Sequence, residues 1–182
     1  MLQDDNSSTV KSKKSSKHKY RKKIHIIGDS IIKEVKGWKI SSKDQKIVVS
    51  TFPGASTNCM ASYIKPTTDL YPDVIILHCG TNDLRMKTNP EEISDKIVNL
   101  ALSSKTPINS VIVSGIVARK DDLNEKAQLV NNYLRDACQT RNIGFIDNSN
   151  IMADSHLNRS KLHLNAKGTN ILAKNFLHSI KY

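Results

Sequence analysis

Five short runs of apolar, mostly β-branched residues recur along the chain, and segments with helical spacing separate them. The runs cover residues 24–27, 47–52, 73–79, 110–117 and 143–147. Their length and composition are typical of strands that are buried on both faces. Because strands that alternate with helices form a parallel sheet, we expect five parallel strands.

Capping residues as well as periodicity mark the intervening helices. Residues 89–92 (Asn-Pro-Glu-Glu) place a capping amide, a proline at the first helical position and two acids in the first turn. Apolar stripes predict a helix from about Asp121 to Ala137 and a last helix that starts near Asn165. The remaining signals predict shorter helices at 31–37 and 56–70, the second ending around Pro66.

This order of elements predicts an α/β fold with a doubly wound parallel sheet. Right-handed crossovers favour the strand order 2-1-3-4-5, with a switch point between the first and third strands. The carboxyl ends of the first three strands then lie side by side. That edge of an open α/β sheet is where ligands bind.

Length, composition and cysteine usage narrow the class of protein. A chain of 182 residues with 38% hydrophobic content is long enough to form one domain with a hydrophobic core. It contains no apolar run that could span a bilayer, and its first residues lack the apolar core of a signal peptide. Cys59, Cys79 and Cys138 are scattered without metal-ligand spacing, which favours reduced thiols and an intracellular location, cytoplasmic or nuclear.

The net charge of +11 is unevenly distributed. Residues 1–23 contain eight Lys or Arg against two Asp. We expect residues 1–22 to form a disordered basic leader and residues 23–182 to form the domain. The run 11–23 is interpreted as a solvated segment, as a nuclear-import signal, or as an anchor for nucleic acid or anionic lipid.

Candidate chemistry is concentrated where the strands end. Gly28-Asp29-Ser30 follows the first strand, Pro53-Gly54-Ala55 follows the second, and Gly80-Thr81-Asn82-Asp83 follows the third. The segment Leu162-His163-Leu164-Asn165 lies directly before the last helix, so His163 can return over the same edge. We interpret Asp29 and Asp83 as turn-stabilising residues.

Each of these residues also has a purely structural interpretation. Ser30 could be a helix N-cap, Gly54 a point of backbone freedom, Asn82 a turn residue, and His163 an exposed loop residue. Together, however, they could perform acyl transfer, with Ser30 as nucleophile and His163 as base. The backbone N–H groups of Ser30 and Gly54 and the side-chain amide of Asn82 would then bind the oxyanion.

In these four blocks the chain resembles the SGNH hydrolases, also called GDSL-like esterases. The blocks stand in family order over nearly all of residues 24–182, and Gly80-Thr81-Asn82-Asp83 is the most specific of them. The resemblance implies a flavodoxin-like three-layer α/β/α sandwich that hydrolyses esters, thioesters or acetyl groups without a metal or organic cofactor. Residues 77–83 with 162–165 also resemble the esterase-like domains of some non-LTR retrotransposon proteins.

One position departs from the family pattern. The family usually has an Asp three residues before the histidine, and Ser160 stands there in this chain. Ser160 could accept a hydrogen bond from the imidazole but brings no negative charge, whereas Asp154 could supply a carboxylate from the preceding loop. The sequence therefore predicts a serine-dependent carboxylesterase or acetylesterase with a Ser–His dyad or an altered triad, acting on a small acyl ester. The alternative is a catalytically weak binding module in a nucleic-acid- or lipid-associated assembly.

Overall fold

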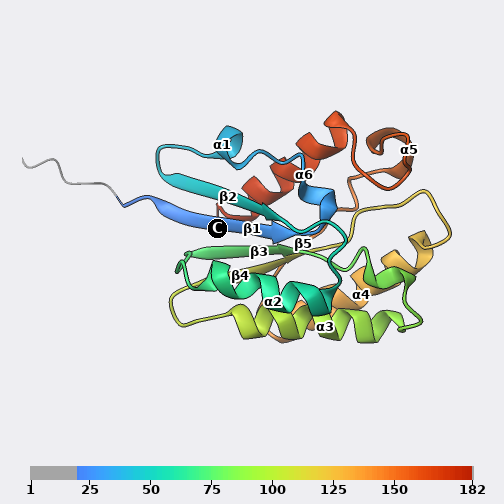
Figure 1. Ribbon diagram of the computed structural model, residues 1–182, viewed down its shortest axis with the longest axis horizontal. Coiled ribbons are helices and arrows are strands. Elements are labelled where there is room, and N and C mark those ends of the chain that lie inside the picture. Colours follow the sequence, from blue (N-terminus) through green and yellow to red (C-terminus); the bar gives the residue numbers. More distant parts are fainter. Residues whose placement is uncertain (1–19, 182) are drawn as a thin grey trace, which may run out of the picture.

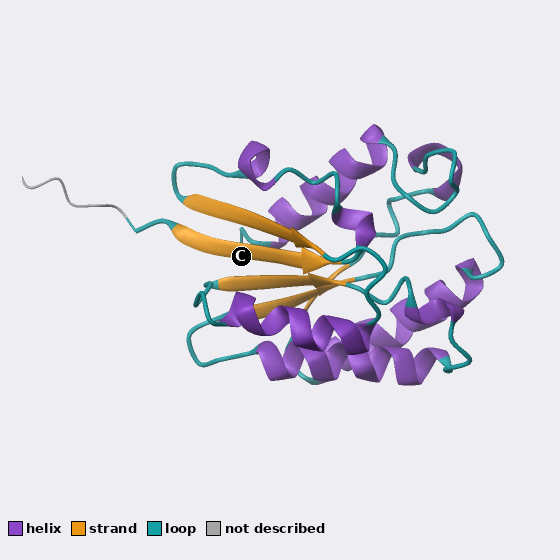
Figure 2. Cartoon of the chain, in the orientation of Figure 1, coloured by secondary structure: helices purple, strands orange, loops and turns teal. Residues whose placement is uncertain are grey.

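The computed structural model describes residues 20–181, so most of the predicted leader lies outside the described residues. The chain forms five strands, β1 (Lys22–Gly28), β2 (Gln45–Thr51), β3 (Val74–His78), β4 (Ser110–Ser114) and β5 (Gly144–Ile146). All neighbouring strands pair in parallel, in the order β2-β1-β3-β4-β5 (Figure 2). The predicted fold class and strand order are thereby confirmed.

Helices cover both faces of the sheet and complete the three layers (Figure 1). One face carries α2 (Thr57–Thr68), α3 (Pro90–Ser104) and α4 (Asn124–Thr140). The other carries α1 (Gly37–Ile40) and α6 (Ala166–Ser179), with α5 (Ala153–His156) beside α6. Two 3-10 turns, η1 (Ser30–Ile32) and η2 (Asp83–Arg85), follow β1 and β3.

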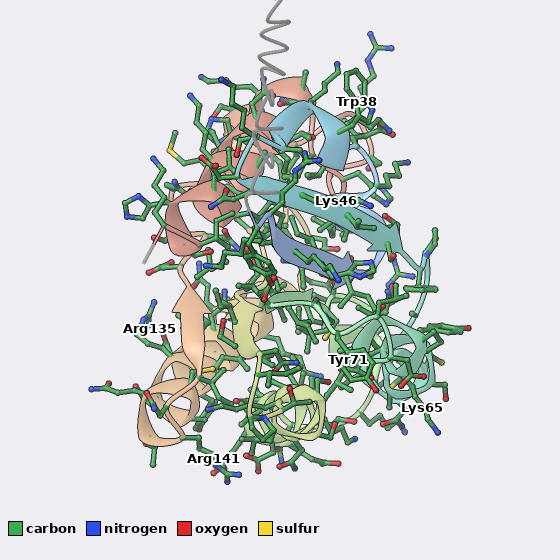
Figure 3. The ribbon with its side chains drawn as sticks, turned by 90° about the vertical axis from the view of Figure 1, so that its left-hand side faces the viewer. Trp38, Lys46, Lys65, Tyr71, Arg135 and Arg141 are labelled. Carbon is green, nitrogen blue, oxygen red and sulfur yellow. The ribbon has the colours of Figure 1, made fainter. Side chains whose placement is uncertain are left out.

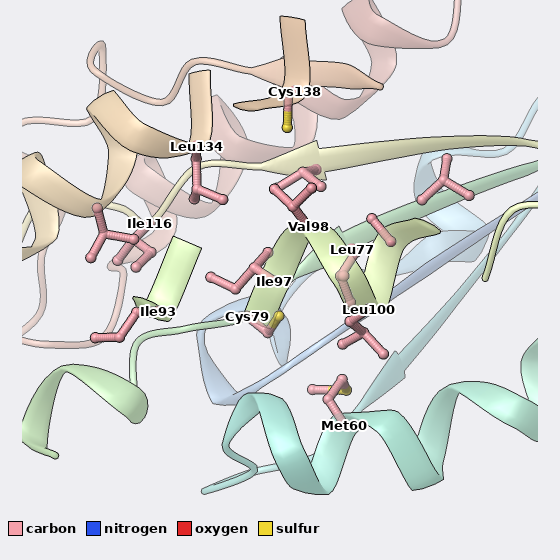
Figure 4. Close-up of a cluster of buried hydrophobic side chains, with 14 of the residues drawn as sticks. Met60, Leu77, Cys79, Ile93, Ile97, Val98, Leu100, Ile116, Leu134 and Cys138 are labelled. Carbon is pink, nitrogen blue, oxygen red and sulfur yellow. The ribbon is translucent and has the colours of Figure 1, made fainter. Parts of the chain in front are cut away.

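Alternate residues of the central strands supply two hydrophobic cores. Ile27 and Leu77 pack with the α2–α4 layer, whereas Ile26 and Ile76 pack with the α6 layer, which contributes Phe176. Figure 4 shows the first core, where Leu77 lies among side chains of α2, α3 and α4. This alternation is the consequence of a sheet covered on both faces, and it explains the continuous apolar runs in the sequence.

Two predicted helices differ from those observed. The expected helix at 31–37 is replaced by the turn η1 and the short α1. Gly37 passes so close to β2 that a Cβ there would lie 2.5 Å from the Ile47 carbonyl oxygen, so contact with the sheet decides the path. In contrast, α2 continues through Pro66 to Thr68. Thr67 is buried, and packing against the sheet outweighs the hydrogen bond that the proline removes.

The register of the sheet brings the ends of the first three strands to one level. Gly28 is aligned with both Thr51 and His78, so the turns after β1, β2 and β3 begin side by side. A Cβ on Gly28 would lie 2.3 Å from the His78 carbonyl oxygen, which makes glycine necessary at this crossing. The next amide, of Asp29, donates to that carbonyl at 3.1 Å and fixes the start of the first turn.

Candidate active site

Ser30 begins the turn η1 at the carboxyl end of β1. The turn is capped by Asp29, whose Oδ1 accepts a hydrogen bond from the Ile31 amide at 3.0 Å. The interpretation of Ser30 as the N-cap is therefore wrong, because Asp29 already fills that position. The Ser30 hydroxyl is free to face the histidine loop, and its Oγ lies 3.1 Å from Nε2 of His163.

His163 belongs to a tight loop that ends just before α6, which Asn165 caps. The Nδ1 atom of His163 lies 3.3 Å from Ser160 Oγ. Ser160 Oγ in turn donates to Asn158 Oδ1 at 2.6 Å. Because its single proton points to Asn158, the Ser160 oxygen can only accept from Nδ1–H. This pattern leaves Nε2 as the unprotonated nitrogen that faces Ser30.

Ser160 is also held in place by the backbone of its own loop. Its Oγ accepts from the His163 amide at 3.2 Å and the Leu162 amide at 3.4 Å. The Ser160 amide donates to Asn158 Oδ1 at 2.9 Å. Asn158 lies outside the motifs that the sequence predicts to form the site, although an Asn two residues before a Ser is a recognisable side-chain-to-backbone turn signal.

Asp154, the other expected partner of His163, is engaged elsewhere. Its exposed carboxylate pairs with Lys120 Nζ at 2.7 Å. Within residues 20–181, it makes no hydrogen bond with His163. Asp154 lies in the first turn of the short α5, whereas Ser160 belongs to the same loop as His163. Of these two residues, only Ser160 is therefore in contact with the imidazole.

The surroundings of His163 favour its neutral form. Partial burial, and to a lesser extent the positive charge of Lys33, lower the pKa of His163 below its ordinary value. A neutral imidazole at neutral pH can accept a proton from Ser30, which a charged one cannot.

Two further turns lie beside Ser30 and present hydrogen-bond donors. Gly54 adopts a φ of 77°, in the left-handed region that favours glycine, and the space where a Cβ would point is open. Asn82 donates through Nδ2 to the Ala55 carbonyl oxygen at 3.0 Å, and the second hydrogen of the same NH₂ group has no acceptor among residues 20–181. The contact also links the Asn82 turn to the Gly54 turn.

Asp83 strengthens this link between the two turns. Its two carboxylate oxygens accept from the Thr57 amide at 3.1 and 3.0 Å. Burial raises the pKa of Asp83, partly offset by the hydrogen bond from Thr57. The turn-stabilising roles expected for Asp29 and Asp83 are thus visible in their hydrogen bonds.

Asp29 is the most deeply buried acid of the site. Its Oδ2 lacks a hydrogen-bond partner within the described part of the chain. Burial, with a smaller effect of the nearby Asp83 charge, raises the pKa of Asp29 to about 6. Within residues 20–181, no group of three or more His, Cys, Asp or Glu side chains is arranged to hold a metal ion.

A serine and a histidine in contact at the carboxyl edge of a parallel α/β sheet, with donor-bearing turns beside them, form the arrangement that serine hydrolases use. The chain belongs to the GDSL-like lipase/acylhydrolase family, whose sequence profile matches residues 26–171. The matched range includes the three turns and His163. The resemblance to SGNH hydrolases is therefore confirmed at the level of the family.

Solved structures of the same architecture align with nearly the whole chain. A GDSL-like lipase from Bacteroides thetaiotaomicron has a TM-score of 0.76 at 16% identity, covering 88% of each chain. A lipolytic G-D-S-L family protein from Veillonella parvula has a TM-score of 0.73 at 20% identity, covering 86% of this chain and 96% of its own. An acetylxylan esterase from Geobacillus stearothermophilus has a TM-score of 0.73 at 17% identity, covering 90% of this chain and 95% of its own.

The TM-scores of these three structures establish the common fold. A search of curated proteins finds no match to the chain. Among the helices described in residues 20–181, none is long and apolar enough to cross a membrane.

Proposed function

We propose that the protein is a serine-dependent ester hydrolase acting on small acyl esters. The observation that carries this proposal is the 3.1 Å contact between Ser30 Oγ and His163 Nε2, beside the donor-bearing turns of Gly54 and Asn82. Membership of the GDSL-like lipase/acylhydrolase family supports the same reaction class. The proposed catalytic residues are Ser30 and His163.

The geometry supports a two-step acyl transfer. Ser30 Oγ attacks the ester carbonyl while His163 Nε2 accepts its proton. The Ser30 and Gly54 amides and the free hydrogen of Asn82 Nδ2 would bind the oxyanion. Collapse of this intermediate breaks the bond to the alcohol, which takes the proton from His163, and leaves an acyl-enzyme. His163 then deprotonates a water that releases the acid and restores Ser30.

In this proposal Ser160 and Asn158 orient the imidazole without contributing a charge. Ser160 Oγ holds Nδ1–H, and Asn158 fixes the direction of the Ser160 hydroxyl. The site is thus a Ser–His dyad with a neutral orienting relay. Such a relay selects the correct tautomer but stabilises the imidazolium less than a carboxylate does, so we expect slow turnover.

A cavity of about 290 Å³ adjoins the Gly54 turn and is lined by Phe52, Cys59 and Tyr63. Its lining shares Gly54 with the proposed site but includes neither Ser30 nor His163. The rings of Phe52 and Tyr63 stack with their centroids 4.4 Å apart and form a rigid wall. The similarity to an acetylxylan esterase supports acetyl esters as a first substrate to test.

A fluorophosphonate probe tests the proposal without knowledge of the substrate, since it reacts only with an activated serine. We expect labelling of the full-length protein at Ser30 and hydrolysis of 4-nitrophenyl acetate. Ser30→Ala should abolish both, and Asn82→Ala should slow hydrolysis on the order of 10²- to 10³-fold. Equal rates for the wild type and Ser30→Ala would refute the esterase assignment.

A second proposal is a catalytically weak binding module, which the absence of a carboxylate from His163 among the described residues favours. Its partner would be nucleic acid or anionic lipid, bound through residues 11–23, in a retroelement-like setting. Only residues 20–23 of that run are described by the structure. An intracellular location, cytoplasmic or nuclear, likewise stays a prediction. Folded protein that the probe leaves unlabelled would favour this alternative.

A further inference from the structure

Lys33 occupies a position next to the proposed nucleophile. In a 3-10 turn, side chains three residues apart are eclipsed, so Lys33 follows Ser30 on the same side of η1. The Lys33 amide donates to the Ser30 carbonyl oxygen at 3.4 Å, and the φ of −56° and ψ of −29° at Lys33 continue the helical path.

The Lys33 ammonium is not neutralised by any of the described residues. It is exposed, and it forms no ion pair with any residue in the range 20–181, whereas the adjacent Glu34 pairs with Lys36 at 3.4 Å. Its charge nevertheless reaches the imidazole, because it is the one charged group that contributes to the lowered pKa of His163 among the described residues.

The other charges near the site do not cancel that of Lys33. The histidine loop adds Arg159 and Lys161, both exposed and without an ion pair in the described part of the chain. Two acids of the adjoining segments are already paired: Asp154 with Lys120, and Asp121 with the buried Arg119 at 2.5 Å. Asp29 and Asp83 are buried beneath the turns. The rim of the site is therefore positively charged.

We propose that the ester substrate carries an anionic group, a carboxylate, sulfate or phosphate, and that Lys33 binds it. Lys33 is then a residue that determines specificity. This inference rests on the proposed esterase function and names the substrate class of the same site.

A bound anion would also assist the chemistry. When His163 takes the proton of Ser30 it becomes positively charged beside Lys33, and the protein places no carboxylate on it within the described residues. An anion held by Lys33 offsets this repulsion, so it should raise kcat as well as lower KM. The missing triad carboxylate is partly replaced by charge on the substrate.

The test compares acetate release from 3-acetoxybenzoate and from 3-acetoxybenzamide, which differ mainly in charge. Each rate is divided by the uncatalysed rate of the same ester. We expect the wild type to prefer the anionic ester by about tenfold in kcat/KM, with the preference falling as salt is added. Lys33→Gln should remove the preference, and Lys33→Glu should reverse it.

A matched control is Lys65→Gln, which removes the same charge from the far end of α2, at the amino ends of the strands (Figure 3). It should keep the wild-type preference. A second measurement is the pH profile with the neutral ester. Because Lys33 lowers the pKa of His163, Lys33→Gln should move the acid limb of kcat/KM to higher pH.

Two outcomes distinguish failure of the role proposed for Lys33 from failure of the proposed esterase function. Ser30-dependent hydrolysis with the same anionic preference in the wild type and Lys33→Gln, or with none, would overturn the role of Lys33 and leave the esterase intact. No hydrolysis of either ester together with no fluorophosphonate labelling would overturn the esterase, and this inference with it.

Discussion

At the scale of single residues, the chemistry of the site depends on what holds His163. Ser160 supplies an oxygen at 3.3 Å from Nδ1, and its hydroxyl donates a hydrogen bond to Asn158 Oδ1. A hydroxyl in this position can fix the tautomer, because it accepts the Nδ1 proton. It cannot balance the charge that the imidazole gains during the reaction. A substitution at Ser160 can separate the effect on the tautomer from the effect on the charge of the imidazole.

Ser160→Asp should raise the rate of ester hydrolysis, because a carboxylate would accept Nδ1–H and stabilise the imidazolium. Loss of a triad Asp costs about 10⁴-fold elsewhere, but that figure includes a tautomer reversal, so we expect a gain of roughly ten- to a hundredfold. Asp154→Asn is the matched control and should change little, since Asp154 pairs with Lys120. Rates that respond only to Asp154→Asn would contradict this view of the site.

Asp29 gives a prediction for stability. Its pKa in the folded protein, about 6, lies above the ordinary 3.8, so the folded state holds this proton more tightly than the unfolded chain. The stability that Asp29 contributes therefore falls as the pH rises from about 4 to above 6. Asn cannot ionise and keeps the oxygen that accepts from Ile31.

Urea unfolding of Asp29→Asn and of the wild type at pH 4 and pH 8 tests the predicted loss of stability on ionisation of Asp29. We expect the variant to gain on the order of 1–3 kcal/mol relative to wild type between the two pH values. An equal difference in the free energy of unfolding at both pH values would show that folding does not raise the pKa of Asp29.

At the scale of elements, hydrogen bonds join the neighbouring turns at the carboxyl edge of the sheet. Asn82 holds the Gly54 turn through Ala55, and Asp83 holds the first turn of α2 through Thr57. The proposed oxyanion donors come from three separate turns, those of Ser30, Gly54 and Asn82, and these contacts fix the spacing of the last two. The strands fix where the turns begin, and the side chains fix how they lie together.

Asp83→Ala should weaken both stability and catalysis, because it leaves the buried Thr57 amide without an acceptor. We expect a loss of about 1–3 kcal/mol in the free energy of unfolding and a fall in kcat that exceeds the change in KM. Asp83→Asn retains one acceptor oxygen and should restore part of kcat. Asp95→Ala, on the exposed face of α3, is the control. A purely structural role would leave kcat of the folded Asp83→Ala protein unchanged.

At the scale of the whole molecule, the residues directly before the predicted boundary at residue 23 already make contacts with the folded part of the chain. Lys22 already pairs with Gln45 in the sheet, Arg21 donates to the Ser42 carbonyl oxygen, and the Tyr20 hydroxyl donates to Asp73. A deletion that separates the leader from the domain should therefore remove residues 1–19 and keep these contacts.

Removal of residues 1–19 should leave the melting temperature and the esterase rate nearly unchanged. The segment contains five lysines and two aspartates and no large apolar cluster, so it has little to add to a core. Binding of the full chain to duplex nucleic acid or anionic vesicles should be weakened by the deletion and should fall steeply with salt. Binding insensitive to both changes would exclude an electrostatic role for the leader.

Most of the architecture could be predicted from sequence, because its signals are local. The apolar runs located all five strands, and the turns Gly28-Asp29-Ser30, Pro53-Gly54-Ala55 and Gly80-Thr81-Asn82-Asp83 appeared at the strand ends. Parallel pairing and right-handed crossovers then limited the strand order to one that the structure confirms. These local signals, together with the rules for strand pairing, were sufficient to place the three turns at one edge of the sheet.

Tertiary structure decided which side chains meet at that edge. Sequence spacing could not choose between Ser160 and Asp154, because the choice depends on how the loop folds around Asn158 and on the pairing of Asp154 with Lys120. It also predicted a helix after Ser30 that continues to about Gly37, whereas packing of Gly37 against β2 leaves a single 3-10 turn and the short α1. Loop conformation is set by contacts between residues far apart in the chain, and no local pattern encodes those contacts.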